Sequence, residues 1–166
     1  MSDSQGAPSF ELDNVGPGPD PCSLSALANG NDFLALYLVH DDDCGDCRTS
    51  VKRVGDRYAA FRARDAVPVA LLPESREATA EWLRASLPYP LLADPDGATA
   101  EAYGQRIRLE AVRDWASLFG RLPDAVVVDV RDHEPELAWA YRGKSTKDHP
   151  STRDVLDAID DILDRD

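Results

Sequence analysis

The chain has 166 residues, which suits one domain with a hydrophobic core, and its formal net charge of −13 argues against nucleic acid or an anionic membrane as a partner. The charge comes from 23 Asp and 8 Glu against 15 Arg and 3 Lys, a usage typical of proteins that work in molar salt, where exposed carboxylates barely repel one another. The sequence has no apolar run of membrane-spanning length and no signal peptide at its start, so we expect a halophilic, cytoplasmic protein that makes no membrane contact.

The N-terminal residues 1–21 are polar and rich in glycine and proline, and they predict an extended lead-in with a short strand at Phe10–Leu12. Residues 22–166 are expected to form a single domain. The segment Ser23–Leu27 predicts one helical turn. The continuous apolar run Phe33–Val39 then predicts a strand that is buried on both faces of a sheet.

The rest of the chain alternates between short apolar runs, which predict strands, and stretches with apolar residues at helical spacing. The expected elements are a helix at Cys47–Arg64, a strand at Val67–Leu72, a helix at Glu74–Leu87, an extended piece at Leu91–Gly97, helices at Ala98–Tyr103 and Arg106–Phe119, strands at Ala125–Val130 and Glu136–Tyr141, and a helix at Pro150–Leu163. Strands that alternate with helices form a largely parallel sheet, and the last two strands add antiparallel pairing. We therefore predict an α/β fold with a three-layer α/β/α arrangement around a mixed central sheet.

A pair of cysteines, Cys44 and Cys47, lies between the first buried strand and the helix that follows it. The carboxyl ends of strands are where α/β proteins build their sites, and the start of a helix stabilises a thiolate through its N–H groups and partial positive charge. Three residues are nearly one helical turn, so both sulfurs come to one face, where one can attack and the other can resolve. Cys22 is expected to act as a small buried hydrophobe.

Acidic residues surround the cysteine pair, with Asp41–Asp43 before it and Asp46 within it. Nearby carboxylates disfavour a thiolate at low salt, and we interpret this cluster as surface that is screened where the protein works. Arg48 supplies positive charge beside Cys47. His40, at the end of the strand, is a candidate proton shuttle.

A zinc site is the main alternative for the two cysteines. The chain has a third cysteine and three histidines, but it has neither a second C-x-x-C nor a pair of histidines at ligand spacing. We therefore expect no metal and no cofactor, while a redox-inert or zinc-stabilised module stays open as a non-catalytic interpretation.

Three segments resemble the peroxiredoxins, the alkyl hydroperoxide reductase and thiol-specific antioxidant superfamily. They are SLSAL at 23–27, LPYPLLADPDGATAEAYG at 87–104 and AVVVDV at 125–130. The arrangement of a strand, a C-x-x-C motif and a helix resembles thioredoxin. The resemblance implies a thioredoxin-like fold of the peroxiredoxin type with an N-terminal extension, and an antioxidant oxidoreductase activity that depends on thiols.

The resemblance also assigns individual residues. Cys47 matches the cysteine that attacks peroxide, although Cys44 and His40 stand where this superfamily usually has threonine and proline. Pro123 is the candidate for the cis-proline that faces the dithiol in thioredoxins. Arg121 is the match for the arginine that helps to hold the peroxide.

Two enzyme interpretations follow from these matches. In the favoured one, Cys47 reduces a peroxide, Cys44 closes a redox-active disulfide, and an external dithiol such as a thioredoxin reduces it. In the alternative, Cys44 attacks a protein disulfide and Cys47 resolves the mixed disulfide. Either enzyme is expected to act as a monomer or a homodimer.

Overall fold

The computed structural model describes residues 5–39, 45–82, 86–104, 123–145 and 148–165, and in this part of the chain eight strands form one sheet. The strands are β1 (Gln5–Gly6), β2 (Glu11–Asn14), β3 (Cys22–Ser23), β4 (Phe33–Leu38), β5 (Ala66–Leu72), β6 (Leu91–Ala93), β7 (Asp124–Asp129) and β8 (Glu136–Arg142). They lie in the order β1-β8-β7-β4-β5-β6-β2-β3. The two longest buried strands, β4 and β5, therefore occupy the centre of the sheet.

The sheet is mixed, as the sequence predicts. Parallel pairing joins β4 to β5 and β5 to β6, because helices connect these strands in sequence. Every other pair is antiparallel, including β4 with β7 and β7 with β8. The N-terminal lead-in also joins the sheet, since β1 pairs with β8 and β2 pairs with β6.

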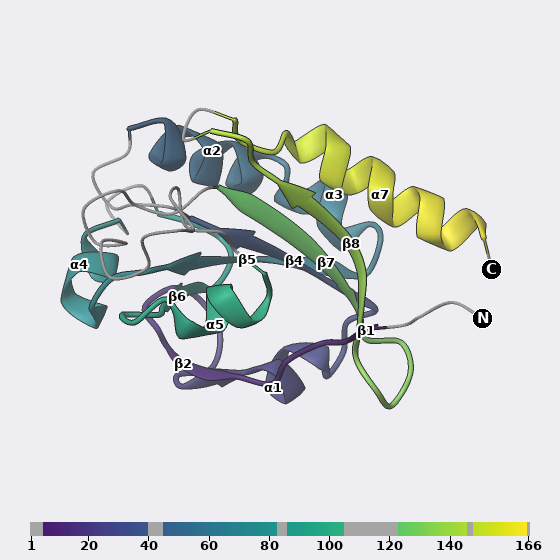
Figure 1. Cartoon of the computed structure of the whole chain (residues 1–166), viewed down its shortest axis with the longest axis horizontal. Coiled ribbons are helices and arrows are strands. Elements are labelled where there is room, and N and C mark those ends of the chain that lie inside the picture. Colours follow the sequence, from purple (N-terminus) through teal and green to yellow (C-terminus); the bar gives the residue numbers. More distant parts are fainter. Residues whose placement is uncertain (1–4, 40–44, 83–85, 105–122, 146–147, 166) are drawn as a thin grey trace.

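Helices cover both faces of the sheet and complete the three layers (Figure 1). The described helices are α1 (Leu24–Ala28), α2 (Gly45–Asp56), α3 (Tyr58–Arg62), α4 (Arg76–Ala80), α5 (Ala98–Ala102) and α7 (Thr152–Asp164). Figure 1 shows α2, α3 and α7 on one face, and α1 and α5 on the other. Successive residues of a strand point to opposite faces of the sheet, so alternate residues pack against the helices of different faces.

Strand β4 shows this division most clearly, because all six of its residues are buried. Phe33, Ala35 and Tyr37 belong to the hydrophobic cluster under α2, α3 and α7. Leu34, Leu36 and Leu38 belong to the second cluster, together with the buried residues of α1 and with Cys22. The single sheet therefore separates two hydrophobic cores.

Two predicted helices differ from those in the structure. The helix expected at Cys47–Arg64 is two helices, α2 and α3, with a break at Arg57 two residues after Gly55, and glycine is a poor helix former. The helix expected at Glu74–Leu87 contains α4, which covers only Arg76–Ala80. The helix expected at Arg106–Phe119 lies outside the described residues.

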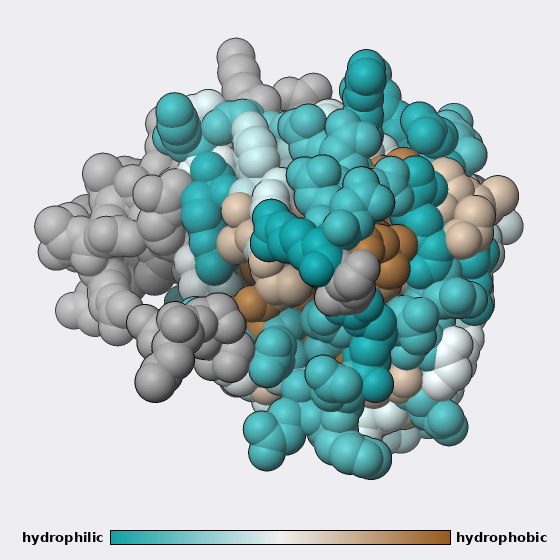
Figure 2. All heavy atoms as spheres, turned by 90° about the vertical axis from the view of Figure 1, so that its right-hand side faces the viewer, coloured by the Kyte–Doolittle hydropathy of each residue, from teal (hydrophilic) through white to brown (hydrophobic). Residues whose placement is uncertain are grey.

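One end of the molecule presents a mainly polar surface. Figure 2 shows the end of the molecule where α7 finishes, and most of this face is hydrophilic, with apolar areas between the polar side chains. Among the described residues, no helix is both long and apolar enough to cross a membrane.

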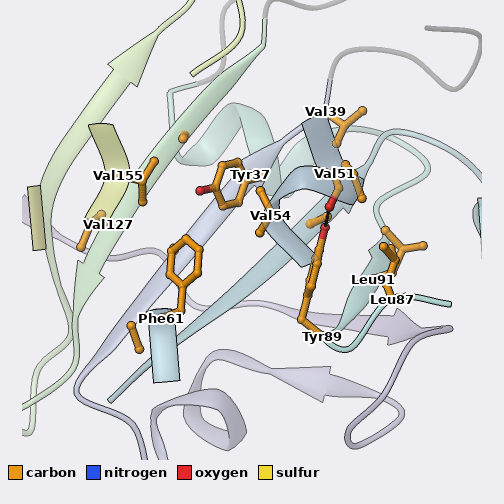
Figure 3. Close-up of a cluster of buried hydrophobic side chains, with 14 of the residues drawn as sticks. Tyr37, Val39, Val51, Val54, Phe61, Leu87, Tyr89, Leu91, Val127 and Val155 are labelled. Carbon is orange, nitrogen blue, oxygen red and sulfur yellow. Dashed lines mark hydrogen bonds between the residues drawn. The ribbon is translucent and has the colours of Figure 1, made fainter. Parts of the chain in front are cut away.

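Tyr89 attaches the segment before β6 to α2. Its hydroxyl is buried and donates a hydrogen bond of 2.6 Å to the Val51 carbonyl oxygen (Figure 3). Tyr37 offers a matched contrast, because its hydroxyl is also buried but has no hydrogen-bond partner among the described residues. Burial raises the pKa of both tyrosines, so both hydroxyls stay protonated.

The two tyrosines are expected to respond oppositely to removal of the hydroxyl. Tyr89→Phe should lower the free energy of unfolding by about 1 kcal/mol, because it deletes a buried hydrogen bond. Tyr37→Phe should leave it unchanged or raise it by up to about 1 kcal/mol, because an unpaired polar atom leaves the core. Urea titrations of the two variants and the wild type measure this difference, and equal destabilisation by both changes would contradict it.

Candidate active site

The site begins where β4 ends. The antiparallel register of β4 and β7 pairs Leu38 with Asp124, so the first residue of β7 lies beside the last residue of β4. Helix α2 begins at Gly45, and Cys47 is in its first turn. A helix N-terminus favours a thiolate over a thiol, because its N–H groups and partial positive charge stabilise the anion. Cys47 is only 2% exposed, so this stabilisation acts away from bulk water.

A small pocket opens beside Cys47. It has a volume of about 20 Å³, which is enough for a group the size of one water molecule. Four segments meet around it, and the lining residues are Tyr37, Leu38, Val39, Cys47, Ser50, Val51, Pro123, Asp124, His149 and Pro150. The pocket therefore suits an oxygen atom of a small substrate better than a bulky group.

The Pro123–Asp124 wall of the pocket is fixed by β8. Asp124 is 1% exposed, and its carboxylate accepts hydrogen bonds from Arg142 at 3.1 Å and from the Gly143 N–H at 2.9 Å. The Gly143 N–H also lies 3.0 Å from the Pro123 carbonyl oxygen. Because Asp124 and Arg142 are oppositely charged, the pair adds little net charge beside Cys47.

Glycine is required at position 143 by these backbone contacts. A Cβ there would lie 2.8 Å from the Asp148 carbonyl oxygen and even closer to that of Pro123. Both neighbours are main-chain atoms, so neither has a flexible end that could move aside.

His149 is placed in the pocket by the hydrogen bonds of Asp148, the residue before it. The carboxylate of Asp148 accepts a hydrogen bond from the Tyr141 hydroxyl and another, of 2.9 Å, from the Lys144 N–H. These bonds lower the pKa of Asp148, with the Tyr141 bond as the main cause, and the same bond raises the pKa of Tyr141 to about 12. The segment from Asp148 to Pro150 is thereby held against the end of β8.

Tyr37 contributes the opposite wall. Figure 3 shows its hydroxyl pointing away from Val51 and towards the side where Val155 of α7 and Val127 of β7 lie. This hydroxyl is buried and has no hydrogen-bond partner in the described part of the chain.

Of the residues predicted from the sequence, the structure brings Cys47 and Pro123 together. Arg48 is exposed and lies over the ring of Trp82, at 5.2 Å from the ring centroid, and it is not among the described residues that line the pocket. Cys44, His40 and Arg121 lie outside the described residues, as does the peptide bond that precedes Pro123.

Cys22 is separated from the site by the sheet. It is fully buried in the second hydrophobic cluster, whereas Cys47 belongs to the first. Burial, with a smaller effect of Asp20, raises the pKa of Cys22 to about 11. Cys22 therefore lies in the core as a protonated thiol, which is typical of a small hydrophobic residue and not of a resolving cysteine.

Sequence reasoning did not place Tyr37, Asp124 or His149 at the site. Tyr37 was recognised only as part of a buried strand, although it lies on the same face of β4 as the Cys47 helix. His149 was considered only as a possible metal ligand. Among the described residues, no group of three His, Cys, Asp or Glu side chains is arranged to hold a metal ion.

Comparison with known proteins relates the chain to one family. Residues 4–133 match the model of the AhpC/TSA family. No curated protein matches the sequence.

Solved structures share the fold. Peroxidoxin BcpB from Mycobacterium tuberculosis superposes with a TM-score of 0.77 at 19% identity, over 98% of both chains. The reduced 2-Cys peroxiredoxin of Plasmodium vivax gives a TM-score of 0.78 at 16% identity, over 96% of this chain and 81% of that one. Thioredoxin peroxidase I of Plasmodium yoelii gives 0.77 at 16% identity, over 98% and 91%.

Proposed function

The chain belongs to the AhpC/TSA family and shares the peroxiredoxin fold, and we propose that it is a thiol-based peroxidase that reduces peroxides through a dithiol–disulfide cycle of Cys47 and Cys44. The observation that carries the proposal is the position of Cys47, in the first turn of α2 and beside a pocket for one oxygen-sized group. A thiolate there meets the terminal oxygen of a peroxide away from bulk water.

The chemistry takes two steps inside the protein. The Cys47 thiolate attacks the terminal oxygen, the O–O bond breaks, and the leaving alkoxide or hydroxide takes up a proton, so that Cys47 becomes a sulfenic acid. The Cys44 thiol then attacks the sulfenic sulfur, which forms the disulfide and releases water. An external dithiol of the thioredoxin type reduces the disulfide and completes the cycle.

Residues around Cys47 support these steps. Tyr37 lines the small pocket of a site where Cys44 stands in place of the usual threonine. For Arg121 we propose a contact with the bound peroxide, for His40 a role in proton transfer, and for Arg48 a contribution of positive charge near the start of α2.

A second candidate function is disulfide exchange of the thioredoxin type. It is favoured by Pro123, which lines the pocket at Cys47, where the thioredoxin resemblance expects a proline opposite the dithiol. In that case Cys44 attacks a protein disulfide and Cys47 resolves it. We propose a reducing, cytoplasmic compartment for either activity, and a monomer or homodimer as the working form.

One experiment separates the two candidates. Reduced wild type and Cys44→Ser are each treated with one equivalent of hydrogen peroxide in high salt, and their intact masses are measured. The proposal predicts that the wild type loses two hydrogens and that Cys44→Ser gains one oxygen at Cys47 in a single turnover. If Cys44→Ser instead stays unmodified, and a Cys47→Ser variant traps partner proteins through Cys44, the disulfide-exchange function replaces the proposed one.

A further inference from the structure

A second, wider pocket adjoins the one at Cys47. It has a volume of about 390 Å³, and it is lined by Thr49, Ser50, Arg53, His149, Pro150, Ser151 and Thr152. Three of these residues, Ser50, His149 and Pro150, also line the small pocket. The two pockets are therefore neighbours that share one wall, with Cys47 at the inner end.

The two pockets fit different parts of one substrate molecule. About 20 Å³ beside Cys47 admits one oxygen-sized group. About 390 Å³ lies within the range of sites for small organic ligands. This combination fits an organic hydroperoxide, whose terminal oxygen reaches Cys47 while the rest of the molecule stays in the wider pocket.

The lining of the wider pocket indicates the charge of that remainder. Arg53 and His149 are the basic side chains there, Thr49, Ser50, Ser151 and Thr152 add hydroxyls, and no carboxylate is found among the described lining residues. In a chain with 31 acidic and 18 basic residues, a pocket of this composition is unusual. It attracts an anion rather than a cation or an apolar tail.

Two acidic residues, Asp148 and Asp154, lie close in sequence to the residues that line the wider pocket. Asp148 precedes His149, but its carboxylate already accepts hydrogen bonds from Tyr141 and from the Lys144 N–H. Asp154 lies in the first turn of α7, where its own N–H donates to the Ser151 hydroxyl oxygen. The negative charge of Asp154 offsets part of the positive charge at the N-terminus of α7. Arg53 is therefore the side chain that we expect to attract an anion.

We propose that the two pockets together bind a hydroperoxide that carries a carboxylate, with the terminal oxygen at Cys47 and the carboxylate at Arg53. This inference rests on the proposed peroxidase function and adds the substrate class. The carboxylate takes no part in the chemistry, and Arg53 acts by binding and orienting the substrate.

The test compares two substrates that differ at one end, where one carries a carboxylate and the other an uncharged ester. A tertiary alkyl hydroperoxide with a terminal carboxylate and its methyl ester are supplied to the wild type, Arg53→Gln, Arg53→Lys and Arg57→Gln, at the lowest salt at which each protein stays folded. The readout is the ratio of kcat/KM for the acid to that for the ester within each variant. Arg57 is an exposed arginine one turn beyond Arg53 that is not among the described residues lining either pocket, so it controls for general surface charge.

The wild type and Arg57→Gln are expected to prefer the acid by about fivefold, the size of one well-placed, partly exposed ion pair. Arg53→Gln should bring the ratio close to one, and Arg53→Lys should keep part of the preference. A ratio near one in the wild type, or an equal loss in Arg53→Gln and Arg57→Gln, overturns the inference. If the inference is overturned but hydrogen peroxide still oxidises wild-type Cys47, the proposed peroxidase function stands without the proposed substrate class. If no hydroperoxide oxidises Cys47, the proposed function and the substrate class are both wrong.

Discussion

Cys47→Ser is expected to lower kcat/KM for hydrogen peroxide by at least about 10³-fold, because a serine hydroxyl stays protonated where a cysteine sulfur forms a nucleophilic thiolate. The change is small in volume, so the fold around α2 should survive, and circular dichroism of the variant checks this. Peroxide consumption with an excess of an external dithiol measures the rate.

Cys22→Ala is the matched control for that result. Cys22 is as deeply buried as Cys47, but it lies in the core on the other side of the sheet, with its pKa raised to about 11. Its replacement should leave the rate within about twofold of the wild type, even if stability falls by about 1 kcal/mol. Equal losses of activity in the two variants would show that Cys47 is not the attacking residue.

Arg142→Met is expected to lower the free energy of unfolding by about 3 kcal/mol. The side chain of Asp124 is fully buried, and Arg142 is its charged partner at 3.1 Å. Removal of the arginine leaves a buried carboxylate with no opposite charge in that ion pair, which is among the costlier changes that a core can undergo. Arg142 also donates to the Tyr103 carbonyl oxygen at 2.8 Å, so the change removes a second hydrogen bond.

Two further variants serve as controls for the effect of Arg142→Met on stability. Arg153→Met removes an exposed arginine of α7 whose contact with Asp157 is 3.9 Å long, and it should cost less than about 0.5 kcal/mol. The double variant Asp124→Leu with Arg142→Met should be more stable than Arg142→Met alone, because no unpaired charge stays buried. If Arg142→Met and Arg153→Met unfold at the same urea concentration, the buried pair does not hold the site together.

The local sequence was sufficient to predict most strands. The apolar run Phe33–Val39 predicts a strand buried on both faces, and β4 has that character because each of its residues packs into one of the two cores. The position of Cys47 was also predictable, since the motif directly follows this strand and begins a helix. The mixed sheet followed from the order of the elements alone.

Long-range contacts explain what the sequence did not reveal. Asp124 and His149 reach Cys47 because β7 pairs antiparallel with β4 and because hydrogen bonds from Tyr141 and Lys144 hold Asp148 in place. Neither contact leaves a periodic signal in the sequence. The break between α2 and α3 was missed for another reason, since the apolar spacing of Val51, Val54, Tyr58 and Phe61 continues across it.

The glycine at position 143 limits how the catalytic centre can diversify. Behind the Pro123–Asp124 wall of the small pocket, the main chain of Gly143 lies in close contact with that of Pro123 and Asp148, so a side chain at position 143 would displace this wall. Under the proposed function, changes in substrate preference are therefore expected from substitutions on α2 and in the short segment ahead of α7.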